Sequence, residues 1–249
     1  MSDALTLTGR SVRLSLRNVD ALLTSLLLPV VLMLVFVYLF GGAIRGTGTS
    51  YVTYVVPGVI LLCATFGSAT TAVSVSADMS GGIVDRLRSM DVGGRALLAG
   101  HVAASVLRNL ASTLLVLGVG LAIGFRPHAT ALGWLAAGGT LLAFVVAMSW
   151  LAAAIGLLAR SPEGANGATF LLMFLPYASS AFVPVATMPD WLQGFARHQP
   201  VTPVIETLRG LLLDIPVGSR PLVALAWCAG LLTASVALAA VLFARRSGE

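Results

Sequence analysis

Six long apolar runs dominate this sequence, and each has about the length that crosses a lipid bilayer as an α-helix. A span needs about 20 predominantly apolar residues, because a helix rises about 1.5 Å per residue and the hydrocarbon core is about 30 Å thick. The runs cover residues 22–40, 54–75, 102–125, 132–158, 165–183 and 222–243. They predict an all-α integral membrane protein with six transmembrane helices in one domain, residues 1–249.

The composition excludes two large classes of protein. Only 10% of the residues are charged and 57% are hydrophobic, whereas roughly a quarter of a soluble domain is charged. Every basic residue is arginine, and a P-loop needs a lysine on the nucleotide phosphates. The chain is therefore not itself a P-loop ATPase. Its arginines are spread along the segment ends, so the net charge of +5 indicates no nucleic-acid partner.

The arginines also predict the orientation in the membrane. With the N-terminus inside, ten of the fifteen arginines fall on the cytoplasmic side and five on the outer side, which is the bias expected of inner loops. Before the first span, residues 5–19 form a predicted interfacial helix whose Arg10, Arg13 and Arg17 reach lipid headgroups. We therefore expect a multi-pass plasma-membrane protein with both termini in the cytoplasm.

A short polar segment, residues 77–95, separates the second and third apolar runs and holds six charged residues. Within it Ile83, Leu87 and Met90 recur at helical spacing, and glycine pairs stand on both sides. This pattern predicts a short amphipathic cytoplasmic helix. Two interpretations stay open: the helix receives a push from a soluble partner, or it lies on the lipid headgroups.

The second polar segment, residues 184–221, contains six of the eleven prolines. Prolines interrupt helices, so we expect two short helices that dip into the outer leaflet or lie on it, a re-entrant element before the last span. Thr202 is a candidate N-cap of the second helix. Glu206 and Arg209 lie one turn apart, either as a pair or as two solvated side chains.

The predicted spans lack the groups that most self-powered transporters and intramembrane enzymes use. None contains Asp or Glu, the usual relays or ion ligands of ion-driven transporters, although backbone carbonyls remain possible sodium ligands. The three histidines are isolated, so we expect no catalytic residues, no metal site and no enzyme activity in this chain. His101 and Arg108, near the start of the third span, are expected to extend toward the interface.

Aromatic and sulphur side chains in the spans are candidates for contact with an amphipathic or lipid-like compound. In the fifth run such side chains share one predicted helical face, which suits either helix packing or a transport path. The candidates are Phe66, Phe170, Met173, Phe174 and Tyr177.

Three motifs resemble the membrane subunits of ABC-2 type exporters, closest to the daunorubicin-resistance permease group. They are DMSGGIVDRLRSM and GGRALLAGHVAASVLRN around the polar segment, and SSAFVPVATMPDWLQGFARHQPVTPVIETLRGLLL before the last span. The last motif is the most specific, because FVP, MP with W, and QPVTP occur together in that group. The resemblance covers nearly the whole chain.

The resemblance implies two permeases, either two copies of this chain or this chain with a homologous one, bound to two ABC ATPase subunits that carry the ATP and Mg²⁺. The implied coupling helix places these residues on the ATPase: Gly82, Ile83, Val84, Asp85, Arg86, Leu87, Arg88 and Met90. The second and fifth spans then flank the path of a hydrophobic small molecule. Two other functions stay open on sequence: a membrane scaffold that recruits a soluble partner, and an ion-gradient-driven secondary transporter.

Overall fold

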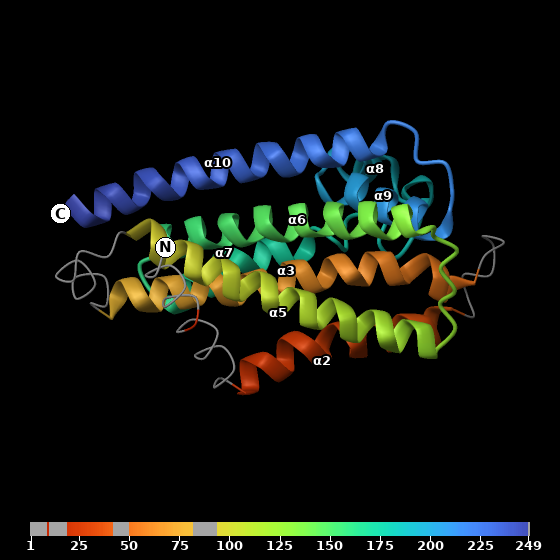
Figure 1. The fold of residues 1–249 in the computed structure, drawn as a ribbon, viewed down its shortest axis with the longest axis horizontal. Helices are drawn as coiled ribbons and strands as arrows, with labels where there is room; N and C mark the ends of the chain where they lie inside the picture. The colour runs from red at the N-terminus through yellow and green to blue at the C-terminus, as the bar shows by residue number, and fades with distance from the viewer. Residues whose placement is uncertain (1–8, 10–18, 42–49, 82–93, 249) are drawn as a thin grey trace.

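The computed structural model describes residue 9 and residues 19–41, 50–81 and 94–248, and its regular elements in these ranges are helical. Figure 1 shows the long helices lying side by side, with their axes roughly along one direction. In chain order the elements are α2 (Val19–Val35), η1 (Phe36–Phe40), α3 (Tyr51–Ser80), α5 (Gly94–Ala122), α6 (Ala131–Leu158), α7 (Pro162–Phe174), η3 (Val185–Thr187), α8 (Asp190–His198), α9 (Val201–Leu213) and α10 (Arg220–Gly248).

Four of the predicted spans correspond to helices long and apolar enough to cross a membrane. These are α3, α5, α6 and α10. The first predicted span, residues 22–40, lies within the continuous helical stretch formed by α2 and η1, which changes from α-helix to π-helix at Phe36. The all-helical membrane fold is thus confirmed for the described residues, while the count of six crossings stays a prediction.

Helix α6 lies between α3 and α10 and also contacts α5, α7 and α9. Its sequence is apolar on all sides, as expected of a helix in a bundle core or a membrane; Phe144 and Met148 are fully buried, whereas Leu132 and Leu135 near its start are exposed. Helix α6 approaches α3 closely at Gly156, where an added Cβ would lie 2.5 Å from the carbonyl oxygen of Ala72. Small residues allow helix backbones to approach in this way.

The two ends of the bundle differ. The end of α3, the start of α5 and the end of α10 come together at one end, where Leu97 packs with Met79 and Phe243. Helices α8 and α9 lie at the other end (Figure 1).

The two short helices α8 and α9 occupy the segment where the prolines predicted them. Helix α9 is largely buried, with Ile205 and Leu208 in the main core, whereas α8 exposes Trp191 and Phe195. Thr202 is not the N-cap, because α9 begins at Val201 and the Thr202 hydroxyl is buried with no hydrogen-bond partner in the described ranges. The depth of these helices in a membrane stays a prediction.

Candidate transport path and coupling region

The fifth predicted span is broken. Helix α7 has 13 residues and ends at Phe174, so it is about 20 Å long, too short for a hydrocarbon core of about 30 Å. Pro176 has no N–H for the next helical hydrogen bond. The Ser179 hydroxyl donates to the Pro176 carbonyl, in the place of a backbone N–H. The prediction of one helix over residues 165–183 is therefore wrong; residues 175–183, here called the turn segment, follow α7.

Side chains from two helices, α3 and α9, and one loop position donate to the backbone carbonyls of the turn segment. The bonds are Tyr51 Oη to Phe182 O (3.1 Å), Tyr54 Oη to Ser180 O (3.0 Å), Arg209 Nη2 to Ser180 O (2.7 Å), and Gln199 Nε2 to Leu175 O (3.1 Å) and Ala178 O (3.2 Å). Irregular backbone is tolerated at membrane depth only where protein or water satisfies it. These donors therefore explain how an apolar run of span length accommodates a break.

Arg209 of α9 is the most connected of these donors. Its Nε and Nη2 atoms lie 3.2 and 3.1 Å from the carbonyl oxygen of Tyr54, and its guanidinium carbon is 3.8 Å from the centre of the Tyr54 ring. Arg209 does not pair with Glu206, which instead forms an ion pair with Arg220 at 3.1 Å. Both sequence interpretations, a Glu206–Arg209 pair and two solvated side chains, are therefore wrong. Arg209 instead connects α9 with α3 and with the turn segment through hydrogen bonds.

Helix α3 also approaches the turn segment through a glycine. A Cβ added at Gly58 would lie 2.6 Å from the carbonyl oxygen of Ala181 and 2.7 Å from its Cα. Real Cβ atoms do not approach backbone this closely, so glycine is required for this contact. The preceding Pro57 lies inside α3, where the missing N–H leaves one carbonyl without its helical donor.

Six aromatic rings form a continuous series that begins on α7, follows the turn segment and ends on η1. Successive centroid distances are 4.8 Å (Phe170–Phe174), 6.1 Å (Phe174–Tyr177), 5.3 Å (Tyr177–Phe182), 4.0 Å (Phe182–Phe36) and 5.4 Å (Phe36–Phe40). We call this set the aromatic series. Phe170 and Phe174 are 56% and 51% exposed, so a surface of rings is open beside α7.

The structure brings together three of the five predicted path residues. Phe170, Phe174 and Tyr177 belong to the aromatic series, Met173 lies partly buried on the same helix, and Phe66 packs against the main core. Sequence reasoning missed Phe36, Phe40 and Phe182. Their positions share no periodicity with α7, so only the tertiary contact between η1 and the turn segment reveals them.

A polar seam joins α3 and α5 within the bundle. His101 Nε2 lies 3.0 Å from Asp78 Oδ2, and Arg108 Nη2 donates to the Gly67 carbonyl (2.9 Å) and the Thr71 hydroxyl (3.2 Å). His101 and Arg108 therefore do not extend toward the interface as predicted. They face the neighbouring helix, because buried polar groups need partners there.

The predicted coupling residues, Gly82, Ile83, Val84, Asp85, Arg86, Leu87, Arg88 and Met90, lie outside the described residues. So does almost all of the predicted interfacial helix at residues 5–19. Of the predicted coupling segment, residues 77–95, the structure describes the two ends, residues 77–81 and 94–95. Helix α3 continues to Ser80, so Asp78 belongs to its last turn rather than to a loop.

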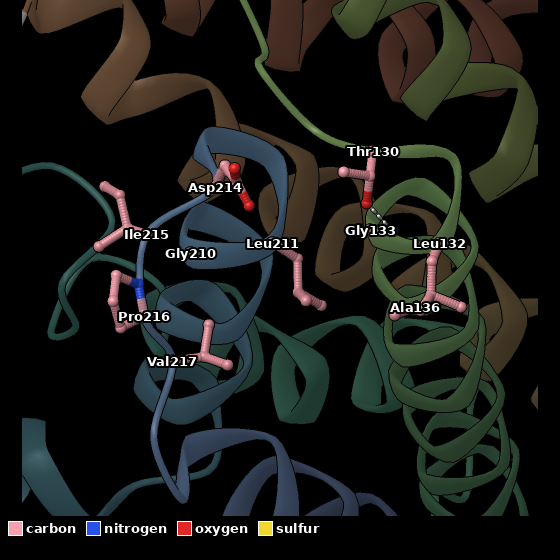
Figure 2. A pocket seen from close by; sticks show the side chains of 10 residues that line it. All are labelled: Thr130, Leu132, Gly133, Ala136, Gly210, Leu211, Asp214, Ile215, Pro216 and Val217. Carbon is pink, nitrogen blue, oxygen red and sulfur yellow. Dashed lines mark hydrogen bonds between the residues drawn. The ribbon is translucent and has the colours of Figure 1, made fainter.

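A pocket of about 420 Å³ lies between the start of α6 and the end of α9. Figure 2 shows its lining, in which the Thr130 hydroxyl caps α6 by accepting from the Gly133 amide, and Asp214 lies across from it. No predicted path residue lines this pocket. Over the part of the chain that the structure describes, no group of three metal-ligating side chains is present.

Comparison with known proteins decides the family. The model of the ABC-2 type transporter membrane family matches residues 3–213. The chain belongs to the ABC-2 type transporter family. The match covers every described element from α2 to α9, and with the apolar helices it makes this chain a multi-pass membrane protein.

Two known permease proteins are similar to the chain over most of its length. The daunorubicin resistance ABC transporter permease protein of Streptomyces coeruleorubidus is 31% identical over 192 residues, which are 77% of this chain and 68% of the relative. A probable doxorubicin resistance ABC transporter permease protein of Mycobacterium tuberculosis is 27% identical over 216 residues, 86% of this chain and 78% of the relative. The resemblance to the daunorubicin-resistance permease group is thereby confirmed.

Proposed function

We propose that this chain is the transmembrane permease subunit of an ATP-driven exporter that moves hydrophobic or amphipathic compounds, such as drugs, antibiotics or lipid-like molecules, out of the cell. The observation that carries the proposal is the ABC-2 family match over residues 3–213. The names of the two relatives, which refer to daunorubicin and doxorubicin, support a drug-like substrate.

The proposed path runs beside α7 and the turn segment. Rings present flat apolar faces that stack on aromatic or amphipathic compounds, and the two rings of the aromatic series on α7, Phe170 and Phe174, are open to the outside of this chain. A second permease, either another copy or a homologous chain, would complete the path on that side. Phe66 and Met173 remain proposed contacts on the neighbouring faces of α3 and α7.

The energy would come from a separate ATPase, because this sequence contains no lysine for a P-loop. Two copies of that ATPase, carrying the ATP and Mg²⁺, would bind the predicted coupling residues from Gly82 to Met90. ATP binding would then shift the paired permeases between inward-open and outward-open populations. This arrangement places both termini in the cytoplasm and the complex in the plasma membrane.

The decisive experiment is transport by the purified complex. The chain is purified with the ATPase that co-elutes with it, inserted into vesicles, and assayed for daunorubicin movement with ATP, without ATP, and with an imposed ion gradient instead. Movement that requires ATP supports the proposal. Movement driven by the ion gradient alone would establish a secondary transporter, and binding of a soluble partner with no transport would establish a scaffold.

Replacing Leu87 with aspartate is expected to uncouple the complex. The leucine is central to the apolar stripe of the predicted coupling helix, and a carboxylate there would oppose docking on an apolar cleft. We expect at least a tenfold loss of ATP-dependent transport with normal membrane insertion. Unchanged transport by this variant would contradict the proposed role of the segment.

Replacing Phe174 with alanine is expected to raise the KM for daunorubicin about three- to tenfold, because an aromatic contact contributes about 0.5–1.5 kcal/mol. The matched control is Phe195→Ala on α8, since Phe195 is 54% exposed and Phe174 is 51% exposed. Phe195 has no ring contact with the aromatic series among the contacts described. Equal effects of the two variants on KM would argue for a general loss of surface apolarity rather than for a path.

A further inference from the structure

Asp78 and His101 form a buried pair at the two ends of the coupling segment. Asp78 lies in the last turn of α3, three residues before the Gly81 C-cap, and His101 lies in the second turn of α5, which begins at Gly94. The two side-chain atoms are 3.0 Å apart, and the side chains are only 12% and 8% exposed. The pair therefore closes the base of the α3–α5 hairpin from which the coupling segment extends.

Apolar contacts lie beside this pair. Val75 of α3 packs in one cluster with Leu98 and Val102 of α5. Met79 packs with Leu97 of α5 and Phe243 of α10. Apolar side chains therefore also join the two helices at the base of the hairpin.

Energetics make a purely stabilising role a poor explanation for Asp78 and His101. Burying a carboxylate and an imidazole removes both from water, and an apolar pair of similar volume often gives equal or greater stability. A buried polar pair also constrains the register of two helices, since its hydrogen bond forms only over a narrow range of relative positions.

The same helix α3 carries the contacts to the proposed path at its opposite end. Tyr51 and Tyr54 donate to turn-segment carbonyls, and Gly58 contacts Ala181. A displacement of the Asp78 end along the helix axis would therefore reach the turn segment through one continuous rod of 30 residues.

We propose that Asp78 and His101 are positioning residues for coupling: their bond makes the end of α3 and the start of α5 move as one unit, so that work applied to the coupling segment reaches the turn segment through α3. This inference rests on the proposed function. The two residues touch neither nucleotide nor transported compound. They fix the position of α5 relative to α3, the helix that connects the coupling segment with the turn segment.

The test measures daunorubicin molecules moved per ATP hydrolysed by the reconstituted complex. The variants are Asp78→Ala, the apolar pair Asp78→Leu with His101→Leu, and the reversed pair Asp78→His with His101→Asp. We expect the first two to keep ATP hydrolysis within about twofold of the unmodified complex and to lower the ratio at least fivefold. The reversed pair should recover at least half of the ratio.

The control is Glu206→Gln, which breaks the other ion pair described, Glu206–Arg220, near the start of α10. It should leave the ratio unchanged. If the correctly assembled apolar pair had the wild-type ratio, the inference would be overturned, because packing alone would then transmit the work. A reversed pair that assembles but recovers none of the ratio would also overturn it. Absence of ATP-dependent transport in the unmodified complex would instead overturn the proposed function, so the two failures are distinguishable.

Discussion

Replacing Arg209 with leucine is expected to lower the free energy of unfolding by about 2–4 kcal/mol and to reduce transport at least tenfold. The guanidinium donates twice to the Tyr54 carbonyl and once to the Ser180 carbonyl, and it stacks on the Tyr54 ring. Hydrogen bonds from a charged donor contribute about 1.5–3 kcal/mol each. The expected loss is smaller than their sum, because in the variant the Tyr54 hydroxyl still donates to the Ser180 carbonyl. Thermal unfolding of the purified complex measures the loss.

Two matched variants separate the causes of the Arg209 effect. Arg209→Lys keeps the charge but loses the planar arrangement of donors, so we expect an intermediate loss of stability and transport. Arg220→Ala removes an arginine whose side chain is 54% exposed and which pairs with Glu206, and the loss of this pair should cost less than about 1 kcal/mol. A loss at Arg220 as large as that at Arg209 would show that any missing positive charge has this effect.

Replacing Gly156 with alanine is expected to be strongly destabilising, although it adds only a single methyl group. The new Cβ would lie 2.5 Å from the Ala72 carbonyl oxygen, 3.0 Å from the Val75 Cβ and 3.1 Å from the Ala72 Cα. Backbone cannot move aside like a flexible side chain, so α3 and α6 must separate. Overpacking of this kind costs about 1–3 kcal/mol, and we expect a clear fall in the unfolding temperature.

The control for this prediction lies on the same helix. A Cβ at Gly138 of α6 meets nothing within 4 Å, so Gly138→Ala should be neutral or stabilise the helix by up to about 1 kcal/mol. Both variants add one methyl group to one apolar helix. If they changed the unfolding temperature equally, the close contact of α3 with α6 would not be what stabilises this bundle.

Several features were predictable from sequence because local chemistry determines them. A run such as residues 132–158 has no stable alternative to a helix in lipid, since each backbone polar group must be satisfied within the segment. The two short helices around Trp191 and Ile205 followed from the flanking prolines. The family could be recognised from three motifs, and the match over residues 3–213 confirms it.

The broken fifth span shows where this reasoning fails. Residues 165–183 have the composition of a span, yet α7 ends at Phe174. Pro176 gave a local indication of a break, but a proline in a transmembrane helix is often accommodated as a kink. The break is stable here because Tyr51, Tyr54, Gln199 and Arg209 supply donors from elsewhere in the chain.

The polar side chains were harder to place for the same reason. Asp78 was expected in the cytoplasmic segment and His101 at the interface, whereas they form one buried pair. Arg209 was expected either to pair with Glu206, one turn away, or to be solvated, whereas its partners lie 155 and 29 residues distant in sequence. Spacing along one helix predicts which side chains are neighbours only when no other helix offers a better partner.

The sequence by itself determined that this chain forms apolar helices of membrane length, that it carries no P-loop lysine, and that it belongs with the ABC-2 permeases, because these properties depend on composition and local motifs. Only the tertiary structure decided where the fifth apolar run breaks, which rings join into the aromatic series, and which partners Asp78 and Arg209 take. The physical reason is that a buried polar group or an interrupted helix is stable only through donors and acceptors that folding brings from distant positions.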